Sequence, residues 1–232
     1  MKNGKNGYIL WDVDTQNDFF DSKFTYQGRT YDPKLGVPEA GSIRPNLQKL
    51  IHYAITKPGW RVMGTVDAHT EADKKHLSKW PKHCMKDTPG QLKIEETRLE
   101  DTIFIGMEDL SERLLEKYVV EDKGAVYFEK HERPQDTDPD ACNSAAVNPN
   151  VAKALKKINP KLITVTGVAL GYCVKEAVNY FLDLGYKVAL VTDAIKEFSP
   201  DELTLYADWK NHGAILVHTR DVLAGKLEEL VK

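Results

Sequence analysis

The order of the apolar segments constrains the fold of this chain more than any other feature. Short runs rich in β-branched residues alternate with amphipathic, helix-like segments along nearly the whole sequence. Such βαβα order is typical of a parallel sheet whose crossover helices cover both of its faces. We therefore expect a three-layer, doubly wound α/β fold with a mostly parallel sheet, formed by a single domain that spans residues 1–232.

The apolar pattern also sets the expected bounds of the elements. Strands are expected at Tyr8–Val13, Trp60–Val66, Thr102–Ile105, Ala125–Phe128, Leu162–Val168, Lys187–Val191 and Ala214–Val217. Helices are expected at Ser42–Thr56, Leu110–Tyr118, Pro149–Ile158, Cys173–Gly185, Ser199–Gly213 and Val222–Val231. Ser42 is expected to cap the first of these helices, and Ser199 and Glu202 are expected to form a capping box. The stretch before Ser42 and the long polar stretch after Val66 are expected to be irregular loops.

Composition and charge exclude several classes of function. A net charge of −3 and a pI near 6.2 provide no field that would attract nucleic acid or an anionic membrane, so a small neutral or mildly polar substrate is expected. The sequence has no apolar run long enough to cross a membrane, and Met1–Gly7 lacks the apolar segment of a secretory leader. The three cysteines, Cys84, Cys142 and Cys173, form no CxxC pair, which predicts free thiols and a cytoplasmic location.

Groups that can carry chemistry follow several of the expected strands. Doubly wound sheets place their functional residues at the carboxyl ends of the strands. Asp14 follows the first strand, an Asp67–His69 pair follows the second, and Lys130 and Cys173 follow two later ones. We therefore expect these side chains to meet at one edge of the sheet.

Cys173 lies after a glycine-flanked turn, where a strand passes into a helix. A helix N-terminus favours the thiolate, and its free backbone amides can stabilise an oxyanion. Asp14 is a candidate base for the thiol, and Lys130 a candidate for lowering the pKa of the thiol. Taken singly, each residue also has a structural interpretation: a buried cysteine, a turn aspartate or a solvated lysine. Cys84 and Cys142 have only the structural one.

A second candidate site involves Asp67, His69 and His83. Alternate residues on extended backbone point the same way, so Asp67 and His69 can converge. One carboxylate and two imidazoles suit zinc, and also iron or manganese, and leave coordination positions open for water or substrate. His76 lies in the same loop, and the sequence leaves open whether it is a fourth ligand.

Several segments together resemble motifs of the isochorismatase-like cysteine hydrolases and, within that family, of the nicotinamidases. Lys130 also stands where a lysine of that family ends a strand, and the resemblance runs along almost the whole chain. The resembling segments are Asp14 to Phe19 (DTQNDF), Asp67 to His69 (DAH), Trp80 to Cys84 (WPKHC) with Thr88 to Gly90 (TPG), and Gly167 to Val174 (GVALGYCV).

The resemblance implies a catalytic triad of Asp14, Lys130 and Cys173 in the isochorismatase-like hydrolase fold. It also implies a cis peptide between Val168 and Ala169, and an oxyanion hole formed by the amides of Ala169 and Cys173. The implied reaction is hydrolysis of a small carboxamide through a cysteine thioester, with nicotinamide giving nicotinate and ammonia.

The resemblance further implies how the substrate is held. Phe19 and Trp80 would enclose a flat aromatic ring between them. One divalent metal ion, zinc first with iron or manganese as alternatives, would be bound by Asp67, His69 and His83. A homo-oligomer is compatible with the sequence, which does not decide the point.

Three departures from the family pattern leave the substrate open. Leu170-Gly171 stands where threonine and aspartate are usual, and the stretch after Lys130 lacks the usual serine and phenylalanine pattern. The segment between His83 and Lys130 is long and is expected to carry an extra helix. The alternatives are a sister enzyme that acts on a carbamoyl or ureido compound, and a non-catalytic member that binds a ligand.

Overall fold

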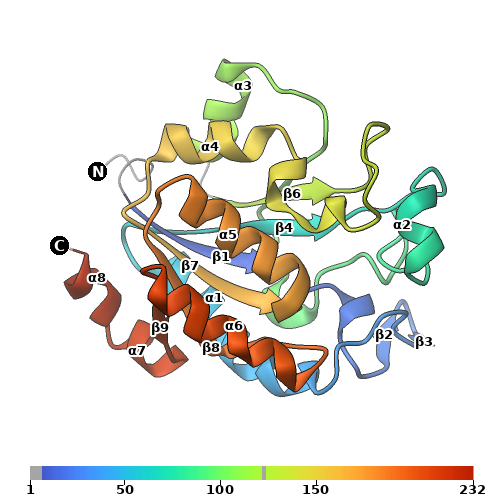
Figure 1. The fold of residues 1–232 in the computed structure, drawn as a ribbon, viewed down its shortest axis with the longest axis horizontal. Coiled ribbons are helices and arrows are strands. Elements are labelled where there is room, and N and C mark those ends of the chain that lie inside the picture. The colour runs from blue at the N-terminus through green and yellow to red at the C-terminus, as the bar shows by residue number, and fades with distance from the viewer. Residues whose placement is uncertain (1–6, 122–123, 232) are drawn as a thin grey trace.

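A computed structural model describes residues 7–121 and 124–231 of the chain (Figure 1). Its centre is a seven-stranded sheet with strand order β5-β6-β4-β1-β7-β8-β9, in which every pairing is parallel. The doubly wound α/β fold predicted from the sequence is therefore confirmed. The strands are β1 (Tyr8–Val13), β4 (Trp60–Asp67), β5 (Thr102–Ile105), β6 (Ala125–Lys130), β7 (Leu162–Val168), β8 (Val188–Lys196) and β9 (Ile215–Val217). Residues 1–6, where no secretory leader is expected, lie outside the described residues.

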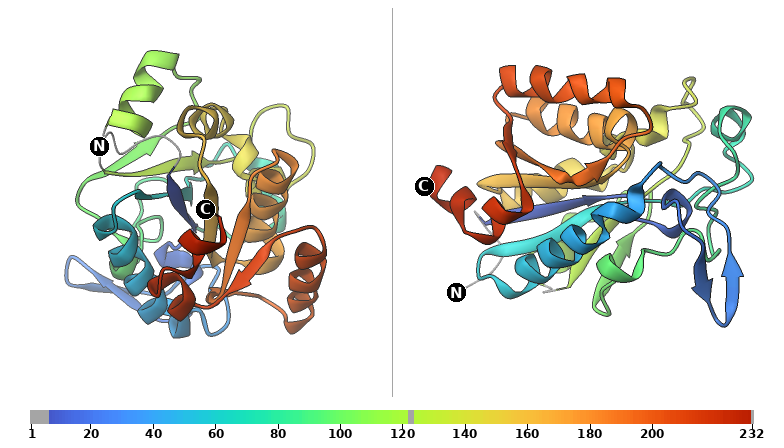
Figure 2. Two further views of the ribbon diagram at one scale, coloured as in Figure 1. Left: turned by 90° about the vertical axis from the view of Figure 1, so that its left-hand side faces the viewer. Right: turned by 90° about the horizontal axis from the view of Figure 1, so that it is seen from below.

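Helices cover both faces of this sheet, as two views at right angles show (Figure 2). One layer contains α3 (Glu112–Glu116), α4 (Asn150–Ile158), α5 (Lys175–Asp183) and α6 (Thr204–Asn211). The opposite layer contains α1 (Arg44–Thr56), α7 (Thr219–Leu223) and α8 (Lys226–Leu230). On β1, Trp11 packs against Phe128 and Phe181 in the first layer, while Leu10 is buried on the second. Burial on both faces explains why β1 is an almost continuous apolar run.

Two helix starts differ from the sequence prediction. Ser42 lies inside a 3-10 turn (Ala40–Ile43), and α1 begins two residues later, where Pro45 occupies its first turn. Proline has no N–H to satisfy and suits the first turn of a helix, so the predicted cap at Ser42 is wrong. The helix predicted to begin at Cys173 begins at Lys175, after one π-helical turn (Leu170–Val174).

The predicted capping box at Ser199 is also wrong. The Ser199 hydroxyl accepts a hydrogen bond from the backbone N–H of Asp201, within a 3-10 turn (Pro200–Leu203) that precedes α6. Glu202 does not fold back onto Ser199. Its Oε2 accepts the backbone N–H of Gly171 at 2.8 Å, because the missing Cβ of this glycine leaves room for the carboxylate.

Further differences concern two helices, the irregular regions and strand β8, which runs to Lys196 and not to Val191. The stretch before α1 contains a hairpin of β2 (Phe24–Tyr26) and β3 (Arg29–Tyr31), and the predicted loop after β4 contains the short helix α2 (Lys74–Lys79). The predicted helix at Leu110–Tyr118 is the short α3 followed by a π turn (Lys117–Glu121). The predicted last helix is split into α7 and α8 at Gly225, whose φ of +76° ends a helical turn. None of the helices in residues 7–121 and 124–231 is long and apolar enough to cross a membrane.

Candidate active site

The predicted chemical groups meet where four neighbouring strands end. From β1 the chain continues to β4 on one side, and from β7 it continues to β8 on the other, so the ends of the adjacent strands β1 and β7 form the topological switch point of the sheet. Asp14 follows β1, and Asp67 is the last residue of β4. Lys130 ends β6 in register with Asp67, and Cys173 lies just after β7. All four side chains are buried.

Lys130 connects the other three groups. Its Nζ lies 3.0 Å from Oδ2 of Asp14 and 2.7 Å from Oδ1 of Asp67. The same Nζ lies 3.6 Å from Sγ of Cys173, so one ammonium faces two carboxylates and the thiol. A fully buried lysine is costly unless it is paired, and these contacts supply the pairing.

Burial sets the protonation states of this cluster. Burial raises the pKa of Cys173 well above its usual value, although Lys130 opposes the shift, so the resting side chain is a thiol. Burial also raises the pKa of Asp14 despite the neighbouring ammonium, which makes this carboxylate a stronger base than an ordinary aspartate. Burial would lower the pKa of Lys130, but Asp14 and Asp67 outweigh it and hold that pKa well above its usual value.

Backbone geometry brings the nucleophile segment close to β1. Gly167 has a φ of +114°, and a Cβ at this position would lie 2.0 Å from the carbonyl oxygen of Val13, so only glycine fits. The peptide between Val168 and Ala169 is cis, as the family resemblance implies. Cys173 follows in the π-helical turn that precedes α5. Gly171, in the same turn, is held by the carboxylate of Glu202.

Three imidazoles form a second cluster beside Asp67. Ring nitrogens of His69, His76 and His83 all lie within 4.8 Å of one another. The Nδ1 atoms of His76 and His83 each lie 2.7 Å from a backbone carbonyl oxygen. A carbonyl only accepts, so each Nδ1 carries the hydrogen and each Nε2 keeps a lone pair. The Nδ1 of His69 lies 2.8 Å from a carboxylate oxygen of Asp73, which orients that ring in the same way.

These Nε2 atoms and Asp67 suit a divalent cation. The Nε2 atoms of His69 and His76 are buried without a hydrogen-bond partner among the described residues, which is a costly state that a cation would relieve. Oδ2 of Asp67 lies 3.5 Å from Nε2 of His69 and 3.8 Å from that of His83. Imidazole and carboxylate ligands in this number fit zinc, iron or manganese. His76, left open by the sequence, is grouped here with the other two histidines.

The pKa values of two of these histidines move in opposite directions. Burial, together with the neighbouring His69, lowers the pKa of His76 to about 4, so that ring is neutral at physiological pH. Burial opposes a charge on His69 as well, but the neighbouring carboxylates of Asp67 and Asp73 raise its pKa to about 9. A cation in this place would take over the role of the proton on His69.

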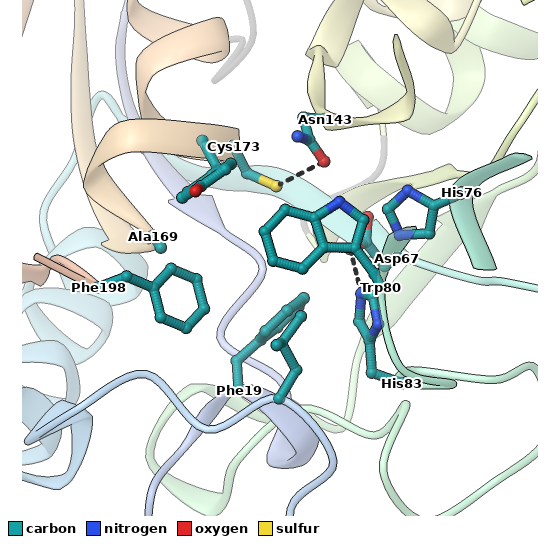
Figure 3. Close-up of a pocket in the computed structure, with 11 residues that line it drawn as sticks. Phe19, Asp67, His76, Trp80, His83, Asn143, Ala169, Cys173 and Phe198 are labelled. Atoms are coloured by element: carbon teal, nitrogen blue, oxygen red, sulfur yellow. Dashed lines mark hydrogen bonds and ion pairs between the residues drawn. The ribbon is translucent and has the colours of Figure 1, made fainter. Parts of the chain in front are cut away.

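The cavity between the two clusters is open to solvent, and together with the space at its mouth it encloses about 300 Å³ (Figure 3). Phe19 and Trp80, both expected at the substrate, line it, and Cys173 and Asp67 reach it from the sheet. The full lining consists of Phe19, Leu35, Asp67, His76, Trp80, His83, Asn143, Ala169, Tyr172, Cys173 and Phe198.

Sequence reasoning missed four of the lining residues, of which Leu35 is one. Tyr172 and Phe198 complete an aromatic wall with Trp80, with ring centroids 5.2 Å apart for Trp80–Tyr172 and 5.6 Å for Tyr172–Phe198. Phe198 lies two residues beyond the end of β8, so the strand-end rule that found the other groups also applies to it. Asn143 lies in a 3-10 turn (Ala141–Asn143) after β6, and no motif marks it. Cys84 and Cys142 are buried free thiols, as expected.

The chain forms a doubly wound α/β sheet with buried ionisable groups at its switch point. Proteins of this class place their functional residues at the carboxyl ends of the strands. The isochorismatase domain family matches residues 130–220, the segment that carries Lys130 and Cys173. Among curated protein sequences, none matches the chain significantly.

Solved structures share the fold over nearly the full length of both chains. The crystal structure of pyrazinamidase from Pyrococcus horikoshii in complex with zinc is similar at 27% identity, covering 91% of this chain and 99% of that one, with a TM-score of 0.66. Pyrazinamidase/nicotinamidase from Streptococcus mutans is similar at 20% identity, covering 90% and 99%, with a TM-score of 0.67. N-carbamoylsarcosine amidase from Thermoplasma acidophilum is similar at 20% identity, covering 92% and 96%, with a TM-score of 0.64. The chain is thus similar to the isochorismatase domain family over residues 130–220, and it shares the fold of the solved pyrazinamidase over nearly its full length.

Proposed function

We propose that this chain is a cysteine amidohydrolase that cleaves a small carboxamide to a carboxylic acid and ammonia. The observation that carries the proposal is the position of the Lys130 Nζ, which lies within 3.6 Å of the Cys173 thiol and within 3.0 Å of the Asp14 carboxylate. Cys173 faces the open cavity, so a small substrate can approach the sulfur. Nucleophile, base and orienting cation are the parts that covalent catalysis requires.

The first half of the proposed reaction forms a thioester. Asp14 accepts the thiol proton, and the thiolate of Cys173 attacks the carbonyl carbon of the amide. Neither oxygen of Asp14 receives a hydrogen bond of regular geometry from the described residues, so the carboxylate keeps the capacity for this proton. The backbone amides of Ala169 and Cys173 hold the oxyanion, and Asp14 then returns the proton to the departing ammonia.

The second half releases the acid. A water molecule gives a proton to Asp14 while its oxygen attacks the thioester carbonyl, and the carbon–sulfur bond breaks. The proton on Asp14 returns to the sulfur, which restores the resting thiol. Lys130 keeps its charge throughout, because two carboxylates hold its pKa well above the usual value. It stabilises the thiolate in both halves of the reaction.

Nicotinamide is the substrate that the cavity supports best. Phe19 and Trp80 line the cavity with aromatic surface, and Tyr172 and Phe198 extend it, which suits a flat ring. Asp67, His69, His76 and His83 would hold one divalent cation, zinc before iron or manganese. When bound, such a cation supplies a Lewis acid at the cavity wall for a ring nitrogen or its water. The similar pyrazinamidase is a zinc complex, which supports this choice of cation.

A carbamoyl or ureido compound is the second candidate substrate. The chain shares its fold with N-carbamoylsarcosine amidase along nearly the full length of both proteins. Leu170 and Gly171 also replace the polar pair usual in the resembling family, which removes two polar side chains from the segment before the nucleophile.

Ammonia release from a panel of amides tests both candidates on one preparation. Protein loaded with zinc is assayed with nicotinamide, pyrazinamide, benzamide and an N-carbamoyl amino acid. Benzamide lacks the ring nitrogen, so its kcat/KM should be lower by about ten- to a hundredfold. If benzamide equals nicotinamide, or the carbamoyl compound is the best substrate, the choice of nicotinamide is wrong. Cys173→Ala should release no ammonia, whereas Cys84→Ala, which removes an equally buried thiol away from the cavity, should retain activity.

A further inference from the structure

Asn143 is a polar side chain of the cavity wall that the proposed mechanism does not use. It is only 7% exposed, and its carboxamide points toward the nucleophile (Figure 3). Its Oδ1 lies 3.8 Å from Sγ of Cys173 and accepts the weak hydrogen bond of the thiol. Among the described residues, the side chain of Asn143 has no other hydrogen-bond partner.

The carboxamide of Asn143 keeps unused hydrogen-bonding capacity at the cavity wall, where a bound substrate can complete it. The one donor that Asn143 has is the thiol proton, which passes to Asp14 in the first step of the proposed reaction. Oδ1 of Asn143 therefore has no hydrogen-bond donor when the sulfur approaches the substrate carbonyl. A nitrogen attached to that carbonyl lies close enough to the sulfur to reach Oδ1 in its place.

The segment that carries Asn143 is held by the same groups that hold the nucleophile. Lys130, which contacts the Cys173 thiol, also donates from Nζ to the carbonyl oxygen of Cys142 at 3.3 Å. The backbone N–H of Asn143 bonds the carbonyl oxygen of Asp140 at 2.9 Å. Asn143 therefore has a fixed position relative to the sulfur, which a residue that recognises the reacting group needs.

We propose that Asn143 recognises an N–H of the scissile carboxamide and selects carboxamides over esters of the same acid. The assignment rests on the proposed amidohydrolase function. The Oδ1 acceptor matches an amide N–H, but an ester presents only another acceptor, which Oδ1 repels.

The experiment measures kcat/KM for nicotinamide and for methyl nicotinate. Both give the same nicotinoyl thioester, so the ratio of the two values reports how the leaving group is recognised during acylation. In Asn143→Ala, and in Asn143→Leu, which keeps most of the volume, the amide-to-ester ratio should fall about three- to tenfold, as expected for one neutral hydrogen bond. Asn143→Asp keeps the acceptor and should keep the ratio. Its rates should fall for both substrates, because a carboxylate disfavours the neighbouring thiolate.

The control is Asn46→Ala, which removes a hydrogen bond of 2.7 Å to the carbonyl oxygen of Asp193 away from the cavity and should leave the ratio unchanged. If Asn143→Ala and Asn143→Leu lower kcat/KM equally for the amide and the ester, the residue is only structural. The assignment is then overturned, while the proposed function survives. Wild-type protein that releases no ammonia from any amide overturns the proposed function and the assignment with it.

Discussion

Two buried lysine–aspartate pairs lie near the end of β1, and they differ in how fully their carboxylates are satisfied. Asp12 accepts hydrogen bonds from Lys93 at 2.6 Å and from Tyr127 at 2.8 Å, and the hydroxyl of Thr15 donates to it as well. Asp14, two residues further on, has only the ion pair with Lys130 and receives no hydrogen bond of regular geometry from the described residues.

The comparison separates a structural pair from a reactive one. The donors around Asp12 satisfy its oxygens, so the carboxylate has no reason to take up a proton or meet a ligand. Asp14 keeps free lone pairs beside the thiol of a cavity-lining cysteine. Residue type and burial are the same in both pairs, so what distinguishes the reactive pair is unused hydrogen-bonding capacity next to open space.

The largest expected effect is on activity. Asp14→Asn removes the base but keeps the shape, so kcat/KM for an amide should fall by about 10²- to 10⁴-fold. Its melting temperature should change less than that of Asp12→Asn, because burial already disfavours the charge of Asp14. The matched Asp12→Asn variant should keep kcat/KM per folded molecule. Equal losses of activity in the two variants would remove the distinction between the pairs.

A second prediction concerns stability. Lys93→Met leaves the Asp12 carboxylate buried without its cation and should lower the free energy of unfolding by about 3–5 kcal/mol, measured by urea denaturation. Lys93 lines no part of the cavity, so kcat/KM per folded molecule should stay within about threefold of wild type. A large loss of activity at unchanged stability would mean that this pair belongs to the reaction.

Unused hydrogen-bonding capacity also distinguishes a functional histidine from a structural one. His76 has a buried Nε2 without a hydrogen-bond partner among the described residues, so we expect it to contribute to cation binding. His76→Ala should weaken zinc affinity by at least about tenfold in a competition titration with a chelator. His212→Ala, which changes a histidine on the surface, is the control. If the zinc affinity of His76→Ala is unchanged, His76 has a structural role, and Asp67, His69 and His83 are the ligands.

The smallest expected effect is a displaced pH profile. Asp14 must be ionised to accept the thiol proton, and burial raises its pKa, so kcat/KM should fall as the pH drops through a value above that of an ordinary aspartate, about 3.9. The profile is measured with zinc in excess, so that loss of the cation does not contribute. An acidic limb at or below the ordinary aspartate value would argue against Asp14 as the base.

Much of this arrangement follows from the sequence because it depends on local pattern. The βαβα order predicts the sheet, and the ends of its strands bring Asp14, Asp67, Lys130 and Cys173 together. Their roles stay predictions, because proximity alone does not establish catalysis. Glu202 shows the limit: its capping-box pattern is local, but the carboxylate bonds Gly171 across 31 residues of sequence.

Asn143 shows a second limit. It lies in an irregular segment whose position depends on contacts with Lys130 and with His76 of α2, not on any periodic pattern. Long-range contacts of this kind decide where a loop residue points, so no spacing rule predicts it. The break between α7 and α8 has a local cause instead, the positive φ of Gly225.

The most direct test of the account is mass spectrometry of the protein quenched in acid during turnover of nicotinamide. We expect a nicotinoyl adduct on the peptide that contains Cys173. The adduct should be absent from Cys173→Ala, and its amount should increase when hydrolysis of the thioester is slowed. An adduct on Cys84 or Cys142, or steady ammonia release by Cys173→Ala at the wild-type rate, would contradict the assignment of Cys173 as the nucleophile.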